Sequence, residues 1–361
     1  MLQQKEGRAM IVTHERPHFD EYTAIFLLKK FGENKFPGIS KSRVIYGYEE
    51  GLQRSAHEEI IYEKERTLFI GVGGGRFDEH PVANGERKQN ECAATLVAKA
   101  LGIADDPALE KILKFALNSD IKAAASPFDL AYITKVMHQR YPDNPDKVME
   151  WVMAGLEAKY QEQDSFFNEA KKEFDRMAKI EEIPGPRGVL LRMATVVSDD
   201  EQINKFARSA YGGNTAIVIQ RKSSGNVQIY TDKRYGLRLN DVAQMIRLEE
   251  QKAKGKIITK NWAMLASEKV IGAEEWFFHH IGQMLLNGSL TATGVPTTKI
   301  PLEKIQEIVR IGINPNAFEP KFASRCKRGI CAVSLIKGDR CSWYDFGLQR
   351  CRKIRFEMRK E

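Results

Sequence analysis

The sequence lacks the features of a membrane or secreted protein. No apolar run is long enough to span a bilayer, and residues 1–8 lack the apolar core of a secretory signal. Five cysteines in 361 residues are too few for a disulfide framework. We therefore expect a cytoplasmic protein with no membrane partner.

Internal repeats and low-complexity stretches are also missing, which excludes solenoid and fibrous architectures. A chain of 361 residues is long for a single core, so we expect two domains. Its net charge of +8 favours an anionic partner, and nucleic acid is the first candidate.

Strand and helix patterns alternate in the first third of the chain. Apolar runs predict strands, and periodic segments that end at a glycine predict helices. The strands are expected at residues 9–13, 42–46 and 67–72, and the helices at residues 21–31 and 91–101. This order predicts a doubly wound, mainly parallel α/β sheet, in which ligands bind at the carboxyl ends of the strands.

The rest of the chain divides at the Pro- and Gly-rich stretch 184–188. Before it the pattern is helical, and after it strand patterns return, with a hairpin turn expected at residues 222–226. The predicted domains are a metal-binding domain at 8–130, a helical connector at 131–183, a second, smaller α/β domain at 186–318 and a basic cysteine-rich tail at 319–361.

Histidines and carboxylates follow two of the predicted strands. The first group is His14, His18 and Asp20, and the second is the run Asp78-Glu79-His80. Because both groups follow strands, we expect them to share one metal site. Imidazole and carboxylate ligands together suit Mn²⁺ or another borderline divalent ion, and such an ion promotes phosphoester hydrolysis. Taken singly, each of these histidines fits a surface or hydrogen-bonded core position better than a ligand position.

The segment His14–Asp20 resembles the first motif of the DHH phosphoesterases, and Asp78–His80 resembles their Asp-His-His signature. The branch it resembles best is the melanocyte-proliferating-gene type, also called the metal-dependent protein hydrolase family. That branch has a Val-Gly-Gly segment before its signature, as in residues 72–80, and a helix similar to residues 92–102. The resemblance continues more loosely to about residue 312.

This resemblance implies a manganese-dependent phosphodiesterase, typically a 3′–5′ exonuclease on RNA or short oligonucleotides. It implies metal ligands at His14, His18, Asp20, Asp78, His80 and Asp120. It implies catalytic roles for Asp78 and His80, and we expect Glu79 between them to act as an oxygen ligand or a base. Contacts to substrate are expected from His279 or His280 and from the loop Gly73, Gly74 and Gly75. From the residues alone, structural packing is the default for the histidines, and a tight turn is favoured for the glycines.

Two positions depart from the family pattern. The family has a metal-bridging aspartate where this chain has Gly71, and its middle signature histidine is Glu79 here. These changes leave open a one-metal centre or a catalytically degenerate nucleic-acid-binding protein on the same scaffold. A hydrolase of a small phosphorylated metabolite is a further alternative.

The tail concentrates four thiols and many cations. Its cysteines, which lie outside the resemblance, are Cys326, Cys331, Cys341 and Cys351. Their spacing fits either a structural Zn²⁺ site or four reduced thiols. The basic residues are Arg350, Arg352, Lys353, Arg355, Arg359 and Lys360, with Trp343, Tyr344, Phe346 and Phe356 interleaved. This mixture suits single-stranded nucleic acid, and it also fits a solvated basic terminus.

Overall fold

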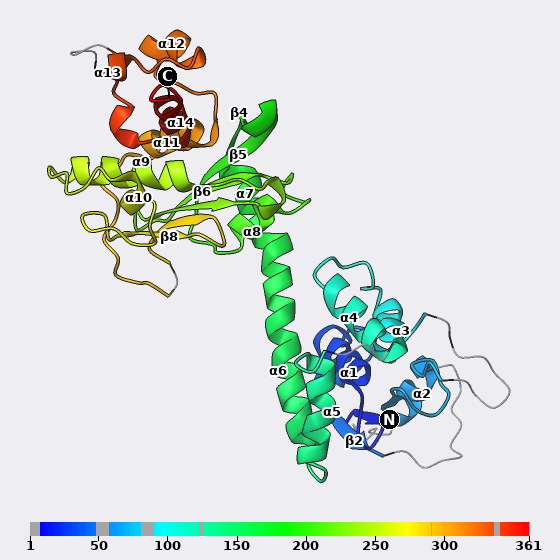
Figure 1. Cartoon of the computed structure of the whole chain (residues 1–361). Helices are drawn as coiled ribbons and strands as arrows, with labels where there is room; N and C mark the ends of the chain where they lie inside the picture. Colours follow the sequence, from blue (N-terminus) through cyan, green and yellow to red (C-terminus); the bar gives the residue numbers. More distant parts are fainter. Residues whose placement is uncertain are drawn as a thin grey trace. The chain divides into compact units, whose positions relative to one another are not determined.

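The computed structural model (Figure 1) describes residues 8–47, 58–80, 88, 90–122, 126–289, 291–335 and 340–360. The chain is mixed α/β and divides into two compact units, Met1–Phe167 and Asn168–Glu361. The segment predicted as a connector, 131–183, is therefore distributed over both units. Among the described residues, no helix has the length and apolar character needed to cross a bilayer.

The first unit contains a small sheet and a set of helices. Its strands are β1 (Met10–Thr13), β2 (Arg43–Tyr46) and β3 (Thr67–Phe69), and its helices are α1 (Phe19–Phe31), α2 (Glu58–Glu65), α3 (Ala93–Leu101), α4 (Glu110–Ile121), α5 (Leu130–Arg140) and α6 (Pro145–Asp164). The strands are parallel in the order β2-β1-β3. The carboxyl ends of β1 and β3 therefore lie at the same sheet edge, as the sequence predicted.

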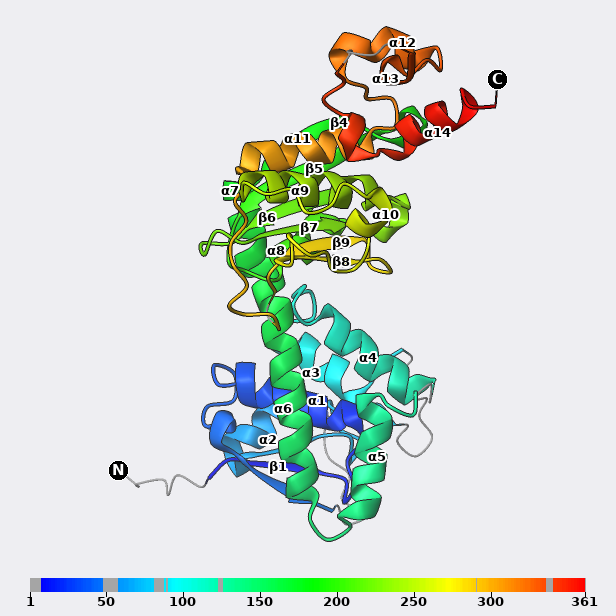
Figure 2. The same ribbon diagram turned by 60° about the vertical axis from the view of Figure 1, so that its left-hand side comes forward.

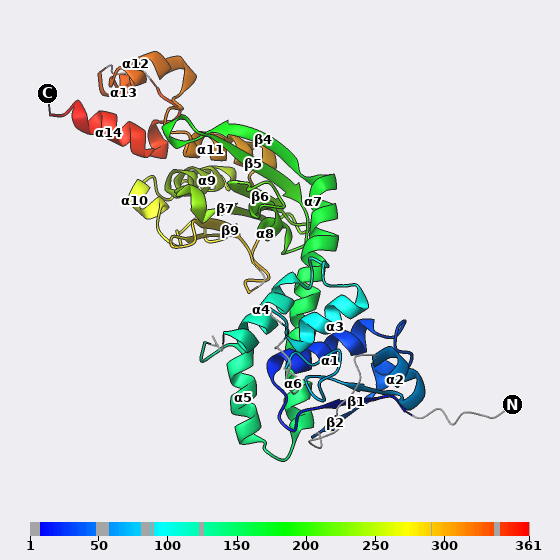
Figure 3. The same cartoon turned by 90° about the vertical axis from the view of Figure 1, so that its right-hand side faces the viewer.

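Helix α1 is the centre of this unit. Its residues from Phe19 to Leu28 are all buried, because α1 packs against α3, α4 and α6. Figure 3 shows α1 with α3 and α4 on one side and with β1 and β2 on the other. A helix buried on all sides is fixed in position, which holds polar residues of its first turn in place at the sheet edge.

The second unit is built on a six-stranded sheet. Its strands are β4 (Lys179–Pro184), β5 (Leu190–Val197), β6 (Ile217–Arg221), β7 (Val227–Thr231), β8 (Trp276–His279) and β9 (Met284–Asn287). Their order is β4-β5-β6-β7-β9-β8, and β5–β6 is the parallel pair in this otherwise antiparallel sheet. The predicted hairpin is confirmed, because β6 and β7 pair across residues 222–226.

Helices cover both faces of this sheet. They are α7 (Lys171–Met177), α8 (Ile203–Arg208), α9 (Asn240–Ala253), α10 (Trp262–Leu265) and α11 (Leu302–Ile313). Figure 2 shows α9 and α11 on one face and α8 on the other. Alternation along β5 explains the two layers: Met193 belongs to the core under α9 and α11, and its neighbour Ala194 lies outside that core.

The predicted tail packs onto this unit. Its helices are α12 (Ala323–Lys327), α13 (Ala332–Leu335) and α14 (Gln349–Glu357). Phe346 and Leu348 are buried in the core shared with α9 and α11. The backbone N–H of Gln349 donates to both carboxylate oxygens of Asp241 at 3.1 Å. These contacts attach the start of α14 to the start of α9.

Candidate metal centre

The loop between β1 and α1 is held by the carboxylate of Glu21. Oε1 of this side chain accepts from the Thr13 hydroxyl at 2.9 Å and contacts Nδ1 of His14 at 2.7 Å. Its Oε2 accepts from the backbone N–H of His18 at 2.6 Å, which satisfies a free donor at the start of α1. One buried carboxylate therefore fixes the strand end, His14 and the helix start.

Gly71 lies directly against this carboxylate. The backbone of Gly71 has φ +67°, and a Cβ placed there would approach Glu21 Oε1 to 2.5 Å. No side chain fits in that space while Glu21 holds its position. This is a physical reason for glycine at the position where the resembled family has a bridging aspartate.

The first group of candidate ligands is His18, Asp20 and Asp120. One ligand atom from each lies within 4.8 Å of the others, whereas the sequence predicted a single site for all the candidate ligands. They line a pocket of about 100 Å³ together with Lys135. Asp20 is 2% exposed, and one of its oxygens accepts from the backbone N–H of Ala93 at 3.2 Å.

Burial raises the pKa of Asp20 well above its usual range, and the charges of Glu21, Glu79 and Asp120 raise it further. A bound cation would reverse this effect, because it favours the ionised form. The negative charges that act on Asp20 come from both candidate groups. The two groups are therefore electrostatically coupled.

The second group is Asp78, Glu79 and His80, whose ligand atoms also lie within 4.8 Å of one another. Asp78 accepts from the backbone N–H of Gly74 at 2.7 Å and contacts Nδ1 of His80 at 2.9 Å. Burial opposes ionisation of Asp78, but these hydrogen bonds outweigh it and lower its pKa. Asp78 is thus held as a carboxylate.

Glu79 is the least satisfied member of the second group. Its side chain is 2% exposed, and burial raises its pKa. Within the described part of the chain, Glu79 Oε2 has no hydrogen-bond partner. A buried carboxylate oxygen without a donor is unfavourable, and a metal ion is one ligand that would satisfy it.

His14 and His80 face a second pocket. Their ring centres are 6.0 Å apart, and both residues line a cavity of about 400 Å³ with Gly71, Gly73 and Asp78. A hydrogen bond to Glu21 raises the pKa of His14, against the opposing effect of burial. His14 belongs to neither of the two groups whose ligand atoms all lie within 4.8 Å of one another. It is therefore a neighbour of the two groups and not a member of either.

The glycine loop, Gly73 to Gly75, forms a tight turn, and one of its residues also lines this cavity. Gly73 and Gly74 have positive φ angles of 83° and 68°, as a tight turn requires. The backbone N–H of Gly74 donates to the Asp78 carboxylate, and the carbonyl of Gly75 accepts from Lys88 Nζ at 2.9 Å. The loop therefore positions Asp78, while Gly73 is the member that lines the cavity.

The two predicted substrate histidines lie in the second unit and make local contacts. His279 Nδ1 accepts from the backbone N–H of Gly282 at 2.7 Å, inside the turn between β8 and β9. The ring of His280 lies 4.3 Å from that of Phe278, centre to centre. Both contacts stabilise the turn.

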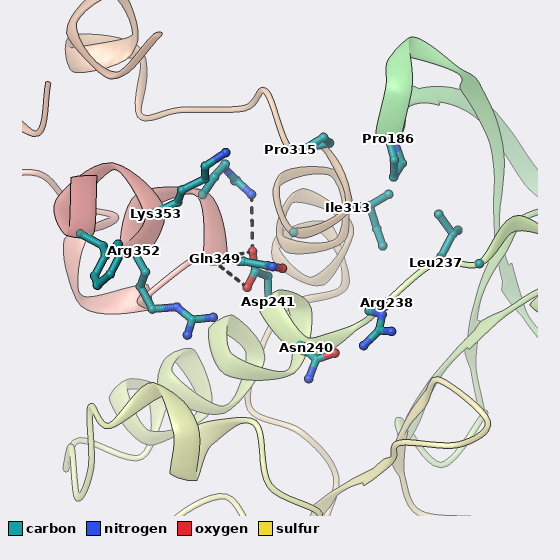
Figure 4. Close-up of a pocket in the computed structure, with 14 residues that line it drawn as sticks. Pro186, Leu237, Arg238, Asn240, Asp241, Ile313, Pro315, Gln349, Arg352 and Lys353 are labelled. Atoms are coloured by element: carbon teal, nitrogen blue, oxygen red, sulfur yellow. Dashed lines mark hydrogen bonds and ion pairs between the residues drawn. The ribbon is translucent and has the colours of Figure 1, made fainter. Parts of the chain in front are cut away.

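A basic pocket in the second unit combines tail residues with the start of α9. It has a volume of about 740 Å³, and its charged lining residues are Arg238, Asp241, Arg350, Arg352 and Lys353. Figure 4 shows Arg352 and Lys353 on one side and Arg238 on the other. The tail cations were predicted from sequence, but Arg238 was not, because nothing in its neighbourhood distinguishes it from other surface cations.

The four tail cysteines are also brought together. All of them line one cavity of about 20 Å³ between α12, α13 and α14, and none forms a disulfide. Burial raises the pKa of the Cys351 thiol to about 11, with smaller effects from Arg350, which lowers it, and from Cys326. Cys92, by contrast, is buried in the core of the first unit, as expected.

Comparisons with known proteins assign no family. No family model matches the sequence, and no curated protein matches it. The crystal structure of an uncharacterized protein from Helicobacter pylori G27 is similar at 11% sequence identity, covering 86% of this chain and 99% of that chain, with a TM-score of 0.26. A likeness at this level carries no argument about fold or function.

Proposed function

We propose that the chain is a metal-dependent phosphodiesterase, a 3′–5′ exonuclease acting on RNA or short oligonucleotides. The proposal is carried by the buried Oε2 of Glu79, which has no hydrogen-bond partner among the described residues and belongs to one of two coupled groups of histidine and carboxylate ligands. The pKa values of Asp20 and Glu79 are raised by burial, and a bound cation would favour the ionised forms of both side chains.

The donor set fits Mn²⁺ better than a metal that prefers only oxygen. Each group supplies one imidazole and two carboxylates, which suits a borderline divalent ion. His18, Asp20 and Asp120 would hold one ion, and the run Asp78–His80 a second. Bound there, such ions would polarise the phosphate and acidify a water molecule.

The protein's own groups would then position the substrate and move protons. His14 uses Nδ1 for Glu21, which leaves Nε2 for a proton or a phosphate oxygen at the 400 Å³ cavity. The raised pKa of His14 increases its protonated fraction near neutral pH, which suits proton donation to a leaving oxygen. Lys135 beside Asp120 offers a positive charge to a phosphate.

A labelled oligoribonucleotide tests this proposal. With Mn²⁺, the full-length protein is expected to shorten a 5′-labelled strand stepwise from its 3′ end. His80→Ala and Glu79→Gln are each expected to reduce the rate by at least ~100-fold, as loss of a ligand or catalytic group does. Failure of every divalent ion to support cleavage would overturn the nuclease assignment.

The second candidate is a nucleic-acid-binding protein without turnover. Gly71 favours it, because the bridging carboxylate is absent, and the basic pocket beside α14 offers an anion-binding surface. Oligonucleotide binding that persists without cleavage, and without Mn²⁺ bound to the first unit, would support this candidate.

A further inference from the structure

Four cysteines from separate segments converge in the second unit. Cys326 lies on α12, Cys331 directly before α13, Cys341 before a short turn, and Cys351 on α14. All four are reduced and line the same cavity. Thiols used only for packing have no need to converge on a shared space, whereas the ligands of one metal ion must do so.

The exposure of these thiols differs from that of a cysteine used for packing. Cys92, in the core of the first unit, is completely buried. The four tail cysteines are all partly exposed. A reduced thiol that solvent can reach is open to oxidation, and coordination to a metal ion protects it. The tail cysteines therefore fit accessible ligands better than core side chains.

The size of the cavity limits what it can hold. Its volume is about 20 Å³, and a cavity needs about 10–15 Å³ to hold a single water molecule. The space therefore accepts one ion and excludes a larger group. Its remaining wall is largely apolar, formed by Phe322, Ala332, Tyr344, Ile354 and Arg355. These apolar groups would screen a metal–thiolate centre from water, and Arg355 would place one cation beside it.

The four sulfur donors select the metal. Thiolates suit Zn²⁺, which takes four sulfur ligands in a tetrahedron, and they do not suit an ion that prefers oxygen. The four residues between Cys326 and Cys331 lie within the usual spacing of a zinc ligand pair. Cys341 and Cys351 supply the other two ligands from a loop and a helix. We propose that the four tail cysteines bind one structural Zn²⁺ ion.

The fold around the cysteines needs such a support. Helices α12 and α13 contain five and four residues, and α12 buries none of its residues. Helices of this length are unstable by themselves. Residues 319–361 also contain twelve Lys and Arg residues against five Asp and Glu residues, so like charges repel within the segment. A zinc ion with four thiolates would join the short segments and place negative charge among these cations.

Zinc binding would also draw the segments closer together. A tetrahedral site with Zn–S bonds of about 2.3 Å holds its sulfurs about 3.8 Å apart. Among the described residues, the groups whose ligand atoms all lie within 4.8 Å of one another include no cysteine. The ion would therefore tighten the contact of α14 with α12 and with the loops around α13. Because Arg352 and Lys353 of α14 line the basic pocket, the zinc site would fix an anion-binding surface.

Metal analysis of the full-length protein tests this inference. Protein purified under reducing conditions without a chelator is expected to contain at least one zinc ion per chain. Replacement of the zinc by Co²⁺ should give the sulfur-to-cobalt charge-transfer band and the visible bands of a tetrahedral thiolate site. The charge-transfer band requires sulfur ligands, so it distinguishes this ion from one held by histidines and carboxylates in the first unit.

Three serine variants locate the ion. Cys326→Ser and Cys351→Ser are each expected to lose the charge-transfer band and to lower the zinc affinity, measured by competition with a chelator, by at least ~100-fold, the upper end of what loss of an outer-shell partner costs. Cys92→Ser is a matched control that should keep both, because Cys92 is the N-cap of α3 and serine is favourable there.

The wild-type Co²⁺ spectrum is decisive by itself, so poor folding of a variant leaves the test intact. Absence of the sulfur-to-cobalt band from the wild type would overturn the inference, as would a band that persists in both ligand variants. Iron with sulfide in place of zinc would also overturn it. None of these results bears on Mn²⁺ in the first unit.

Discussion

Asp20 combines almost complete burial with three neighbouring negative charges, which is unfavourable in a protein without metal. Because folding raises the pKa of Asp20, the folded chain binds more protons than the unfolded chain at pH values between the usual carboxyl pKa and the raised one. The stability of the metal-free protein should therefore fall as pH rises from the usual carboxyl pKa through the raised one.

Asp20→Asn removes this charge and keeps an oxygen that can accept from Ala93. We expect the variant to raise the unfolding free energy of the metal-free protein by about 1–2 kcal/mol at neutral pH, and to flatten its pH dependence. It should also reduce the thermal stabilisation that Mn²⁺ gives to the wild type. Thermal and urea unfolding measure these effects, with the exposed Asp105→Asn as control. An Asp20→Asn variant that is stabilised by Mn²⁺ like the wild type would contradict this role.

Gly71 gives a second prediction at the scale of single residues. Gly71→Ala introduces a Cβ 2.5 Å from Glu21 Oε1 on a backbone with φ +67°. Gly102→Ala is a matched control, because Gly102 has φ +71° and nothing within 4 Å of the added Cβ. Backbone strain alone costs about 1–2 kcal/mol, so we expect that loss in the control and about 1–3 kcal/mol more in Gly71→Ala.

The two variants should also differ at the metal centre. Displacement of Glu21 releases His14 and the start of α1, so Gly71→Ala should weaken Mn²⁺ binding while Gly102→Ala leaves it unchanged. Urea unfolding and Mn²⁺ titration provide the two readouts. Equal effects of the two substitutions would show that Glu21 does not require the space at Gly71.

At the scale of elements, the basic pocket depends on how α14 meets α9. Lys353 on α14 and Arg238 before α9 line this pocket from different segments. The double variant Arg238→Gln/Lys353→Gln should weaken oligonucleotide binding and lower the salt-dependence slope by about 2, one for each lost phosphate contact. Fluorescence anisotropy at several salt concentrations measures this, and Lys256→Gln, at an exposed lysine outside the pocket, is the control. An unchanged slope would exclude phosphate contacts in the pocket.

Local sequence signals predicted elements with strong apolar patterns. The strand predicted at 9–13 corresponds to β1, and the helix predicted at 91–101 to α3. The sequence did not predict β4, because this edge strand is mostly exposed and its charged residues resemble the helical segment before it. The third strand ends at Phe69 rather than at residue 72, since the turn at Gly71 and Gly73 requires positive φ angles.

At the scale of the whole molecule, each unit has its own hydrophobic core. The candidate Mn²⁺ ligands all belong to the first unit, and the four tail cysteines to the second. Spacing along the chain indicated the candidate ligands in both places. It could not predict the contact between Glu21 and Gly71, or the division of the ligands into two groups, because these depend on packing between distant segments.

The number of Mn²⁺ ions bound to the full chain tests the central claim most directly. Titration followed by electron paramagnetic resonance counts bound and free Mn²⁺ on the same sample. We predict two ions per wild-type chain, and loss of at least one ion in either Asp20→Asn or Asp78→Asn. A titration in which all the Mn²⁺ stays free would contradict the assignment of these two groups as a metal centre.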